Sequence, residues 1–163
     1  MSRIIHPFPP VFDESSRVLI LGSFPSPASR ADGFFYLHPQ NRFWPVLSAI
    51  MQVPLPQNNE ERHNLLLRHH IALWDVLAAC EITGADDSSI KNAVPNDLSP
   101  IFSAAKIQAV FTTGQAAFRL YKRFLLPQTK FPAAALPSTS PANARMNLSA
   151  LTEAYRVILP YLS

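Results

Sequence analysis

The chain has 163 residues, only 15% of them charged, and a formal charge of +3. This length fits one domain, and the charge permits nucleic acid as a partner without the dense basic stripe of a nucleic-acid coat. The single cysteine, Cys80, excludes an internal disulfide and a cysteine-rich metal cage. No apolar run approaches the roughly 18 residues of a membrane helix, and the N-terminus does not resemble a secretory signal. We therefore expect a soluble, cytoplasmic protein with no membrane partner.

The first half of the chain is predicted to start irregularly and then to alternate strands with helices. Residues 1–16 form an irregular arm, because its prolines favour extended backbone. A run of branched apolar residues indicates a strand buried on both faces, and a long loop without periodicity follows it. The expected elements are the strand 17–22, the loop 23–40, a helix from Asn41 as its cap to about Met51, a helix over 58–70 and a strand over 71–79.

The second half continues this alternation after a turn-rich segment, in which residues 86–89 are expected to form a turn. The expected elements are a helix over 96–105 opened by Asn96 or Asp97, a strand over 106–114, a helix over 115–125, a strand over 131–138, a loop over 139–145 and a helix over 147–162. Four short apolar strands between helices predict a four-stranded parallel sheet in a single three-layer α/β/α domain.

Ligands of such sheets bind beyond the carboxyl ends of the strands. That rule selects four segments, which begin at Ser23 and Asp75 and span residues 112–115 and 138–145. Small polar residues, Gly and Pro accumulate there, and the aromatic stretch GFFYLHPQNRFW, residues 33–44, springs from the first segment. We therefore expect the functional site at this edge of the sheet.

Several familiar chemistries find no motif in the chain. The stretch GSFPSPAS after the first strand either presents backbone N–H groups to an anion or is a plain turn. It matches neither phosphate-binding nor dinucleotide fingerprints. No nucleophile elbow and no His-rich zinc pattern exist, and Cys80 fits a small buried apolar residue better than a nucleophile. No metal or cofactor is expected.

For a few polar residues near this edge of the sheet, the sequence allows two interpretations each. His38 either bonds to nearby backbone or has a chemical role, and Asp75 either caps the next element or reaches into the cleft. Arg30, Arg42 and Arg145 lie in or next to the loops, with hydroxyls and an amide nearby. Such groups contact phosphodiesters, although scattered surface arginines are the alternative.

The stretch GFFYLHPQNRFW, following VLILGSFPS and paired with LPSTSPANAR, resembles the uracil-DNA glycosylase superfamily. Within it, the chain is most similar to the hypoxanthine (deoxyinosine) DNA glycosylase branch, with mismatch-specific uracil glycosylases as near relatives. The resemblance implies an enzyme that flips a damaged nucleotide out of the duplex and hydrolyses its N-glycosidic bond, leaving an abasic site. It implies damaged DNA as the partner, and no metal, cofactor or obligate protein partner, so we expect a monomer.

The resemblance also implies roles for particular residues. Uracil-removing relatives use an Asp or Asn at the third position of the first motif to activate water, and this chain has Phe24 there. The hypoxanthine branch implies that Asn41 takes over this role. Negative charge on the departing base calls for donors, which either the backbone N–H groups of residues 23–26 or His38 would supply. Tyr36 falls where mismatch-specific relatives stack an aromatic on the flipped base, and the implied substrate-binding residues are Gly22, Ser23, Phe24, Pro25, Ser26, Tyr36 and Thr113.

The second motif implies a clamp on the DNA backbone and a wedge for the vacated site. The implied DNA-contacting residues are Arg30, Ser138, Thr139, Ser140, Pro141, Ala142, Asn143 and Arg145, with residues 141–143 as the wedge. We expect hypoxanthine as the substrate and uracil as a second candidate. A lesion-binding protein without catalysis, which Phe24 permits, and a hydrolase of free nucleosides are the alternatives.

Overall fold

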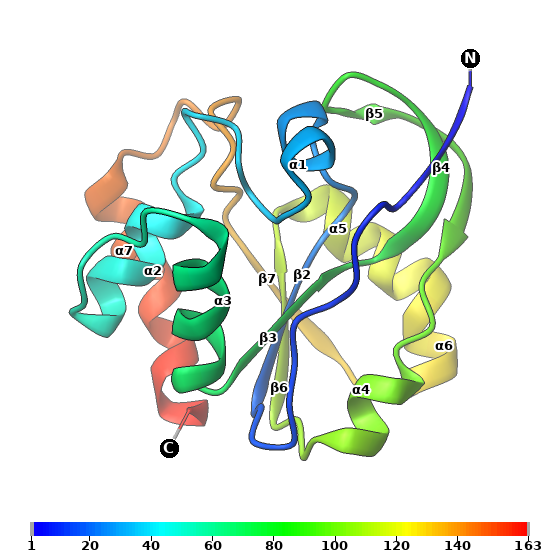
Figure 1. Ribbon diagram of the computed structural model, residues 1–163. Coiled ribbons are helices and arrows are strands. Elements are labelled where there is room, and N and C mark those ends of the chain that lie inside the picture. Colours follow the sequence, from blue (N-terminus) through cyan, green and yellow to red (C-terminus); the bar gives the residue numbers. More distant parts are fainter. Residues whose placement is uncertain (1, 163) are drawn as a thin grey trace.

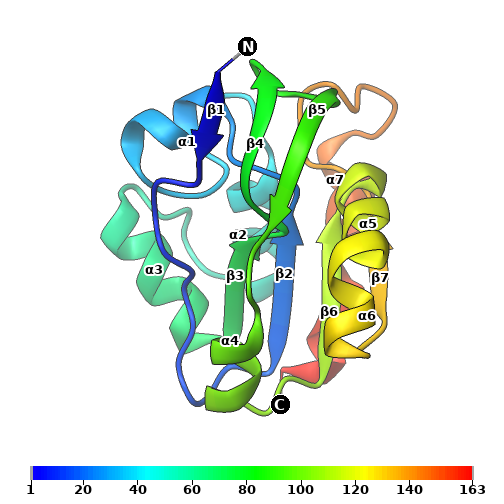
Figure 2. The same ribbon diagram turned by 90° about the vertical axis from the view of Figure 1, so that its right-hand side faces the viewer.

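The computed structural model describes residues 2–162, and its central sheet is the predicted parallel one (Figure 1, Figure 2). The four strands pair in the order β3-β2-β6-β7, all parallel, and are β2 (Val18–Gly22), β3 (Ile71–Asp75), β6 (Ala109–Thr113) and β7 (Ala133–Leu136). All five residues of β2 are buried, as expected for a strand covered on both faces. The prediction of a four-stranded parallel sheet is confirmed.

Helices cover both faces of this sheet and complete three layers (Figure 1). On one face lie α2 (Phe43–Met51), α3 (Asn59–Arg68) and α7 (Leu148–Tyr155), which continues into a 3₁₀ helix, Arg156–Tyr161; on the other lie α4 (Ser99–Ala104), α5 (Gln115–Leu120), a π-helical turn, Tyr121–Leu125, and α6 (Leu126–Thr129). No helix within residues 2–162 is long and apolar enough to cross a bilayer.

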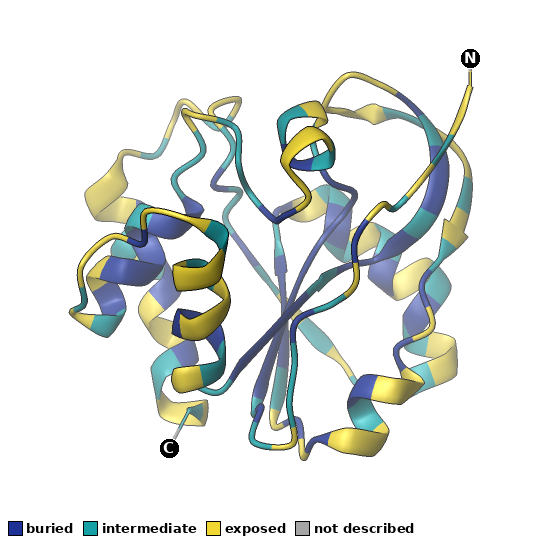
Figure 3. Ribbon diagram, in the orientation of Figure 1, coloured by how far each residue is buried: buried dark blue, intermediate teal, exposed yellow. Residues whose placement is uncertain are grey.

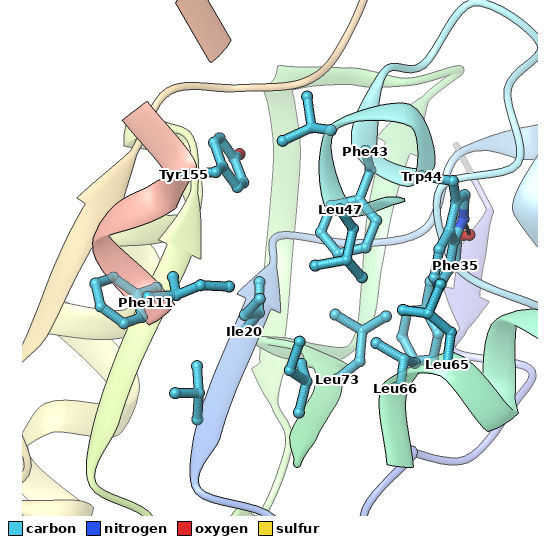
Figure 4. Close-up of a cluster of buried hydrophobic side chains, with 14 of the residues drawn as sticks. Ile20, Phe35, Phe43, Trp44, Leu47, Leu65, Leu66, Leu73, Phe111 and Tyr155 are labelled. Carbon is cyan, nitrogen blue, oxygen red and sulfur yellow. Dashed lines mark hydrogen bonds between the residues drawn. The ribbon is translucent and has the colours of Figure 1, made fainter. Parts of the chain in front are cut away.

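Side chains of β2 alternate between the two cores, as the period of two of a strand requires. Ile20 packs with Phe43, Leu47 and the helices of the first face, whereas Leu19 and Leu21 pack on the second. Figure 4 shows the first core, with aromatic and branched side chains meeting between the sheet and the helices. Figure 3 shows the strands as the most buried part of the molecule.

A second, antiparallel sheet was missed by the sequence prediction. It has the order β1-β4-β5 and consists of β1 (Arg3–Ile5), β4 (Leu77–Thr83) and β5 (Asp86–Pro95). The arm is therefore not irregular throughout, and the expected strand over 71–79 is divided at Val76 between two sheets. The turn expected at 86–89 is wrong, because those residues begin β5. The chain turns instead at Gly84, whose φ of 58° suits a two-residue hairpin loop.

Three helices also differ from expectation, and one of them, α4, begins at Ser99, with Leu98 rather than Asn96 or Asp97 at its N-cap position. The loop over 23–40 contains α1 (Pro27–Asp32), whose first turn is capped by the Ser26 hydroxyl, which accepts from the Ser29 N–H. Helix α2 begins at Phe43, two residues after Asn41, yet the Asn41 Oδ1 accepts from the Phe43 N–H at 2.9 Å. The N-cap position is Arg42, whose side chain makes no cap bond, so the prediction of Asn41 as the cap is wrong, although its side chain still bonds the first helical N–H.

Candidate active site

A cavity of about 510 Å³ lies at the carboxyl ends of the parallel strands, a volume typical of small-molecule sites. All four segments selected from the sequence contribute to its wall. The cavity brings together most of the predicted site residues, namely Gly22, Ser23, Phe24, Pro25, Ser26, Tyr36, His38, Asn41, Thr113, Ser138, Thr139, Ser140, Pro141 and Ala142. In Figure 1 the loops that carry them, together with α1 and the β4–β5 hairpin, gather at the top of the view. The remaining three predicted residues, Arg30, Asn143 and Arg145, lie outside the lining.

The floor of the cavity depends on a glycine at the end of β2. A Cβ at Gly22 would lie 2.5 Å from Asp75 Oδ1 and 3.0 Å from the Tyr36 hydroxyl oxygen. Only glycine leaves these two groups room at this point. The Tyr36 hydroxyl is hydrogen-bonded to Thr113 Oγ1 at 2.8 Å, so the loop that carries Tyr36 is joined to the end of β6.

Tyr36 is held in an unusual conformation. Its φ of 55° is left-handed, which is costly for a bulky side chain and recurs at functional sites. Its ring stacks on Phe43 with centroids 4.1 Å apart and planes 15° apart. Burial, and then the negative charge of Asp75, raise the pKa of Tyr36 well above its usual value. The ring is therefore a fixed, neutral aromatic wall.

Asn41 and His38 are fixed by bonds within their own loop. The Asn41 N–H donates to the His38 carbonyl at 2.9 Å, while its Oδ1 is occupied by the Phe43 N–H. His38 Nδ1 accepts from the Gln40 N–H at 3.1 Å, which leaves Nε2 for the cavity. The interpretation of His38 as bonded to backbone is confirmed, and because the residue also lines the cavity, its chemical role stays a prediction.

The loop over 138–145 is fastened by Arg42. Its Nη2 donates to the carbonyls of Ser140 (3.0 Å) and Asn143 (2.9 Å), and its Nη1 donates to that of Met146. The interpretation of Arg42 as a phosphodiester contact is therefore wrong, because its guanidinium binds the protein's own backbone. Arg30 donates to the Pro25 carbonyl at 2.7 Å.

The wedge loop has a second fastening of its own. The Asn143 Nδ2 donates to the Ser138 carbonyl at 2.9 Å, which closes the turn around residues 138–143. Pro141, Ala142 and Arg145 are exposed. The part of the loop expected to meet DNA therefore faces solvent, while its base is tied down.

Comparison with known proteins identifies the family of the chain. The model of the uracil DNA glycosylase superfamily matches residues 9–162. The chain belongs to this superfamily. Two proteins named hypoxanthine DNA glycosylase are similar to it. The one from Methanosarcina barkeri is 41% identical over 93 residues, which are 56% of this chain and 59% of that protein. The one from Methanosarcina acetivorans is 33% identical over 142 residues, 86% and 89% of the two chains.

A solved structure agrees with this assignment to the uracil DNA glycosylase superfamily. The solution NMR structure of a candidate uracil DNA glycosylase from Methanosarcina acetivorans is 30% identical, with a TM-score of 0.78, and covers 95% of this chain and 99% of that one. The resemblance read from the sequence and the α/β fold class are confirmed. Within residues 2–162, no three His, Cys, Asp or Glu side chains gather closely enough to hold a metal ion.

Sequence reasoning missed two polar groups of the site, one that lines the cavity and one that contacts the cavity wall from behind. Asp87, in β5, lines the cavity mouth, and its Oδ1 accepts from the Ser23 hydroxyl at 2.7 Å. The residue is exposed as a whole, but desolvation of its carboxyl raises its pKa. Gly84 marks a turn after a strand-like run, but the polar, largely exposed residues that follow it show no strand pattern, so the sequence did not indicate this hairpin.

The second missed group is His6, from the arm. Its Nε2 lies 2.8 Å from Asp75 Oδ2, and both side chains are almost fully buried. The two alternatives for Asp75 are thereby decided, since its side chain lines the cavity. No sequence signal links residues 69 positions apart.

Proposed function

We propose that this chain is a monofunctional DNA glycosylase that hydrolyses the N-glycosidic bond of a flipped deaminated base, hypoxanthine first and uracil second, and leaves an abasic site. The observation that carries the proposal is the wall of the cavity, where Asn41 stands beside a first motif whose acidic position is taken by Phe24. The two similar proteins named hypoxanthine DNA glycosylase support the same substrate.

Base binding would use the stacked pair at the cavity wall. Flipping a nucleotide out of the duplex costs a few kcal/mol, and stacking on an aromatic side chain returns about 1–3 kcal/mol. Tyr36, backed by Phe43 and tied to Thr113, presents such a ring without further loss of side-chain freedom. This supports Tyr36 as the stacking surface.

Bond cleavage would proceed by departure of the base ahead of water attack. Positive charge develops on the sugar and negative charge on the departing base. The amide of Asn41 cannot take a proton from water, but it can hold a water at C1′ and contribute by orientation. Fixing Asn41 through its bond to the Phe43 N–H supports that role.

Donors near the first motif would stabilise the departing base. Within residues 2–162, no protein acceptor receives the backbone N–H of Phe24 or Ser26, and both residues line the cavity. With Nε2 of His38, these groups could act on the charge that develops on the purine. Donors fixed before the reaction need no reorganisation, which favours the leaving anion over the neutral base.

The DNA backbone would be held at the rim by the second motif. Hydroxyls of Ser138 and Ser140, the exposed Pro141 and Ala142 and the guanidinium of Arg145 support this assignment, whereas Thr139 is buried. The single cysteine suits a reducing cytoplasm.

A lesion panel tests the proposal. Duplexes that each carry one hypoxanthine, uracil, xanthine or ethenocytosine are incubated with the protein and then treated with alkali, with an undamaged duplex as the control. We expect strand breaks with hypoxanthine above all. No break with any lesion would overturn the proposal, and lesion-specific binding without release of free base would support the inactive lesion-binding alternative.

A further inference from the structure

The antiparallel hairpin of β4 and β5 brings a carboxyl group to the mouth of the cavity. The register of β4 against β5 shifts three times along the hairpin. Such irregularities bend strands and re-aim their side chains. The hairpin curves up toward α1 (Figure 1), and the residues around its turn line the cavity, namely Thr83, Ala85, Asp86 and Asp87. Asp87 thus reaches the site from an element outside the parallel sheet.

Asp87 is held by one of its oxygens and keeps the other available. Its Oδ1 accepts from the Ser23 hydroxyl at 2.7 Å, which ties the hairpin to the segment after β2. Within residues 2–162, no protein donor binds its Oδ2. Desolvation raises the pKa of Asp87, and the negative charges of Asp75 and Asp86 add to this rise, although the bond from Ser23 opposes it. A raised pKa makes the ionised carboxylate a better proton acceptor.

Hydrolysis of an N-glycosidic bond makes two demands that Asn41 does not meet. The sugar becomes positively charged as the base departs, and the water that adds to C1′ must lose a proton. The amide of Asn41 can orient that water, but it carries no charge and takes no proton. A carboxylate beside the sugar meets both demands, because it is negatively charged and accepts a proton.

Three side-chain carboxyl groups line the cavity, and they differ in position and in partners. Asp75 lies at the floor, with its Oδ2 paired to the buried His6. The Oδ1 of Asp86 accepts from the N–H and the hydroxyl of Ser88, within its own strand. A flipped base that enters the cavity leaves its sugar at the mouth, because the sugar stays in the DNA backbone. Asp87 lies at that mouth with an available oxygen.

We propose that Asp87 is a catalytic residue of the glycosidic hydrolysis, which acts from the β4–β5 hairpin on the sugar and on the water held by Asn41. The bond from C1′ to the base nitrogen breaks, and its electron pair leaves with the base while the carboxylate faces the positive sugar. The water oxygen then bonds to C1′, and its proton passes to Asp87 and on to solvent. The base anion takes a proton from solvent. This inference rests on the proposed function, because it requires a flipped nucleotide in this cavity.

The variant Asp87→Asn separates chemistry from support. The amide oxygen can still accept from the Ser23 hydroxyl, but the group carries no charge and takes no proton. In single-turnover assays on a hypoxanthine duplex we expect the rate to fall about 100-fold. DNA affinity, measured by fluorescence anisotropy, should not weaken, because a negative charge near the phosphates is removed. If Asp87 only ties the hairpin to Ser23, the rate stays nearly unchanged, and that result overturns the inference.

Asp86→Asn is the matched control. It removes the same charge from the neighbouring residue of the hairpin, and its amide oxygen can still accept from the Ser88 N–H. We expect its rate on the hypoxanthine duplex to stay close to that of the unaltered protein. An equal loss of rate in the two variants would assign the effect to the net charge of the hairpin and overturn the inference. Thermal melts check that each variant is folded.

Rescue by a small carboxylate tests the chemical group itself. Asp87→Ala leaves space at the cavity mouth that formate can enter. We expect sodium formate to raise the rate of Asp87→Ala several-fold over sodium chloride at the same ionic strength, which keeps the salt dependence of DNA binding equal. Asp87→Asn, in which the amide fills that space, should show no such gain. Equal rates of Asp87→Ala in the two salts overturn the inference.

Failure of the inference can be told apart from failure of the proposed function. If Asp87→Asn cleaves the hypoxanthine duplex as fast as the unaltered protein does, the inference fails and the proposed function stands. If the unaltered protein cleaves no lesion, the proposed function fails and the inference fails with it.

Discussion

Two loops meet at the cavity mouth, and they are held in different ways. The loop over 33–42 is fixed by aromatic packing, since Phe34 and Phe35 are buried and Trp44 Nε1 donates to the Phe35 carbonyl at 2.9 Å. The loop over 138–145 has an exposed tip, and side-chain bonds to its backbone carbonyls tie it down. The first loop carries the groups proposed for chemistry, which need fixed positions, and the second carries those proposed for DNA, which need access.

The substitution with the largest expected effect is Asn41→Ala, in the first of these loops. If the first loop positions a water, we expect turnover of a hypoxanthine duplex to fall about 100-fold or more, because misplacement by about 1 Å has that effect. DNA affinity should stay nearly unchanged, since the second loop is intact. Single-turnover rates and fluorescence anisotropy measure the two quantities.

A matched control for Asn41 exists in α7. Asn147 is the N-cap residue of that helix, with its Oδ1 accepting from the Ala150 N–H at 2.8 Å, so it too binds a backbone N–H at a helix start, and it lies outside the cavity lining. Asn147→Ala should cost about 1 kcal/mol of stability and leave turnover unchanged. Equal turnover of the two variants would reduce the role of Asn41 to its bond with the first N–H of α2.

Arg42→Ala, a substitution in the loop over 33–42, should destabilise the loop over 138–145. The substitution removes bonds from a charged donor to the carbonyls of Ser140, Asn143 and Met146, and we expect the free energy of unfolding to fall by about 2–3 kcal/mol. The freed loop should raise KM more than it lowers kcat. Urea unfolding and steady-state kinetics measure these effects, and unfolding identical to the unaltered protein would show that the loop is held by other contacts.

The parallel sheet could be predicted from the sequence, and the antiparallel one could not. Short apolar runs such as VLILG indicate a strand that is buried on both faces. The parallel topology then predicts a site at the carboxyl ends of the strands. Strand β5 is largely exposed and polar, so it lacks a hydrophobic pattern and is held by backbone pairing with β4. The site residues within strand-end loops were therefore found, whereas Asp87 was not.

Long-range polar contacts also could not be predicted from the sequence. His6 reaches Asp75 only because the arm runs back over the sheet, a path set by the pairing of β1 and of Val11 with Leu73. Arg42 binds main-chain carbonyls, which every residue has, so no sequence motif identifies them as its partners. In both cases the amino acid was visible in the sequence and its partner was not.

Alkaline pH should weaken both loops together. Burial raises the pKa of Tyr36, in the first loop, and of Tyr155, whose hydroxyl donates to the Pro137 carbonyl at the start of the second. The folded protein keeps these protons at a pH where the unfolded chain has lost them. Because the unfolded state then binds fewer protons, stability falls as pH rises above about 10. Melting temperatures measured at increasing pH check this, and Tyr155→Phe should make the decline shallower; an equally steep decline would exclude Tyr155 as a cause.

The smallest expected effect belongs to Arg145→Ala, which tests whether the exposed loop meets phosphate. Loss of one phosphate contact should weaken DNA binding uniformly across sequences and reduce the slope of log affinity against log salt by about one. Stability should change by less than about 0.5 kcal/mol, because the side chain is exposed. Lys106→Ala is the matched control, since it removes one exposed charge before β6, at the opposite edge of the sheet. If the two variants give the same salt slope, net charge alone explains the binding of DNA. The loop over 138–145 would then have no specific role in contacting DNA.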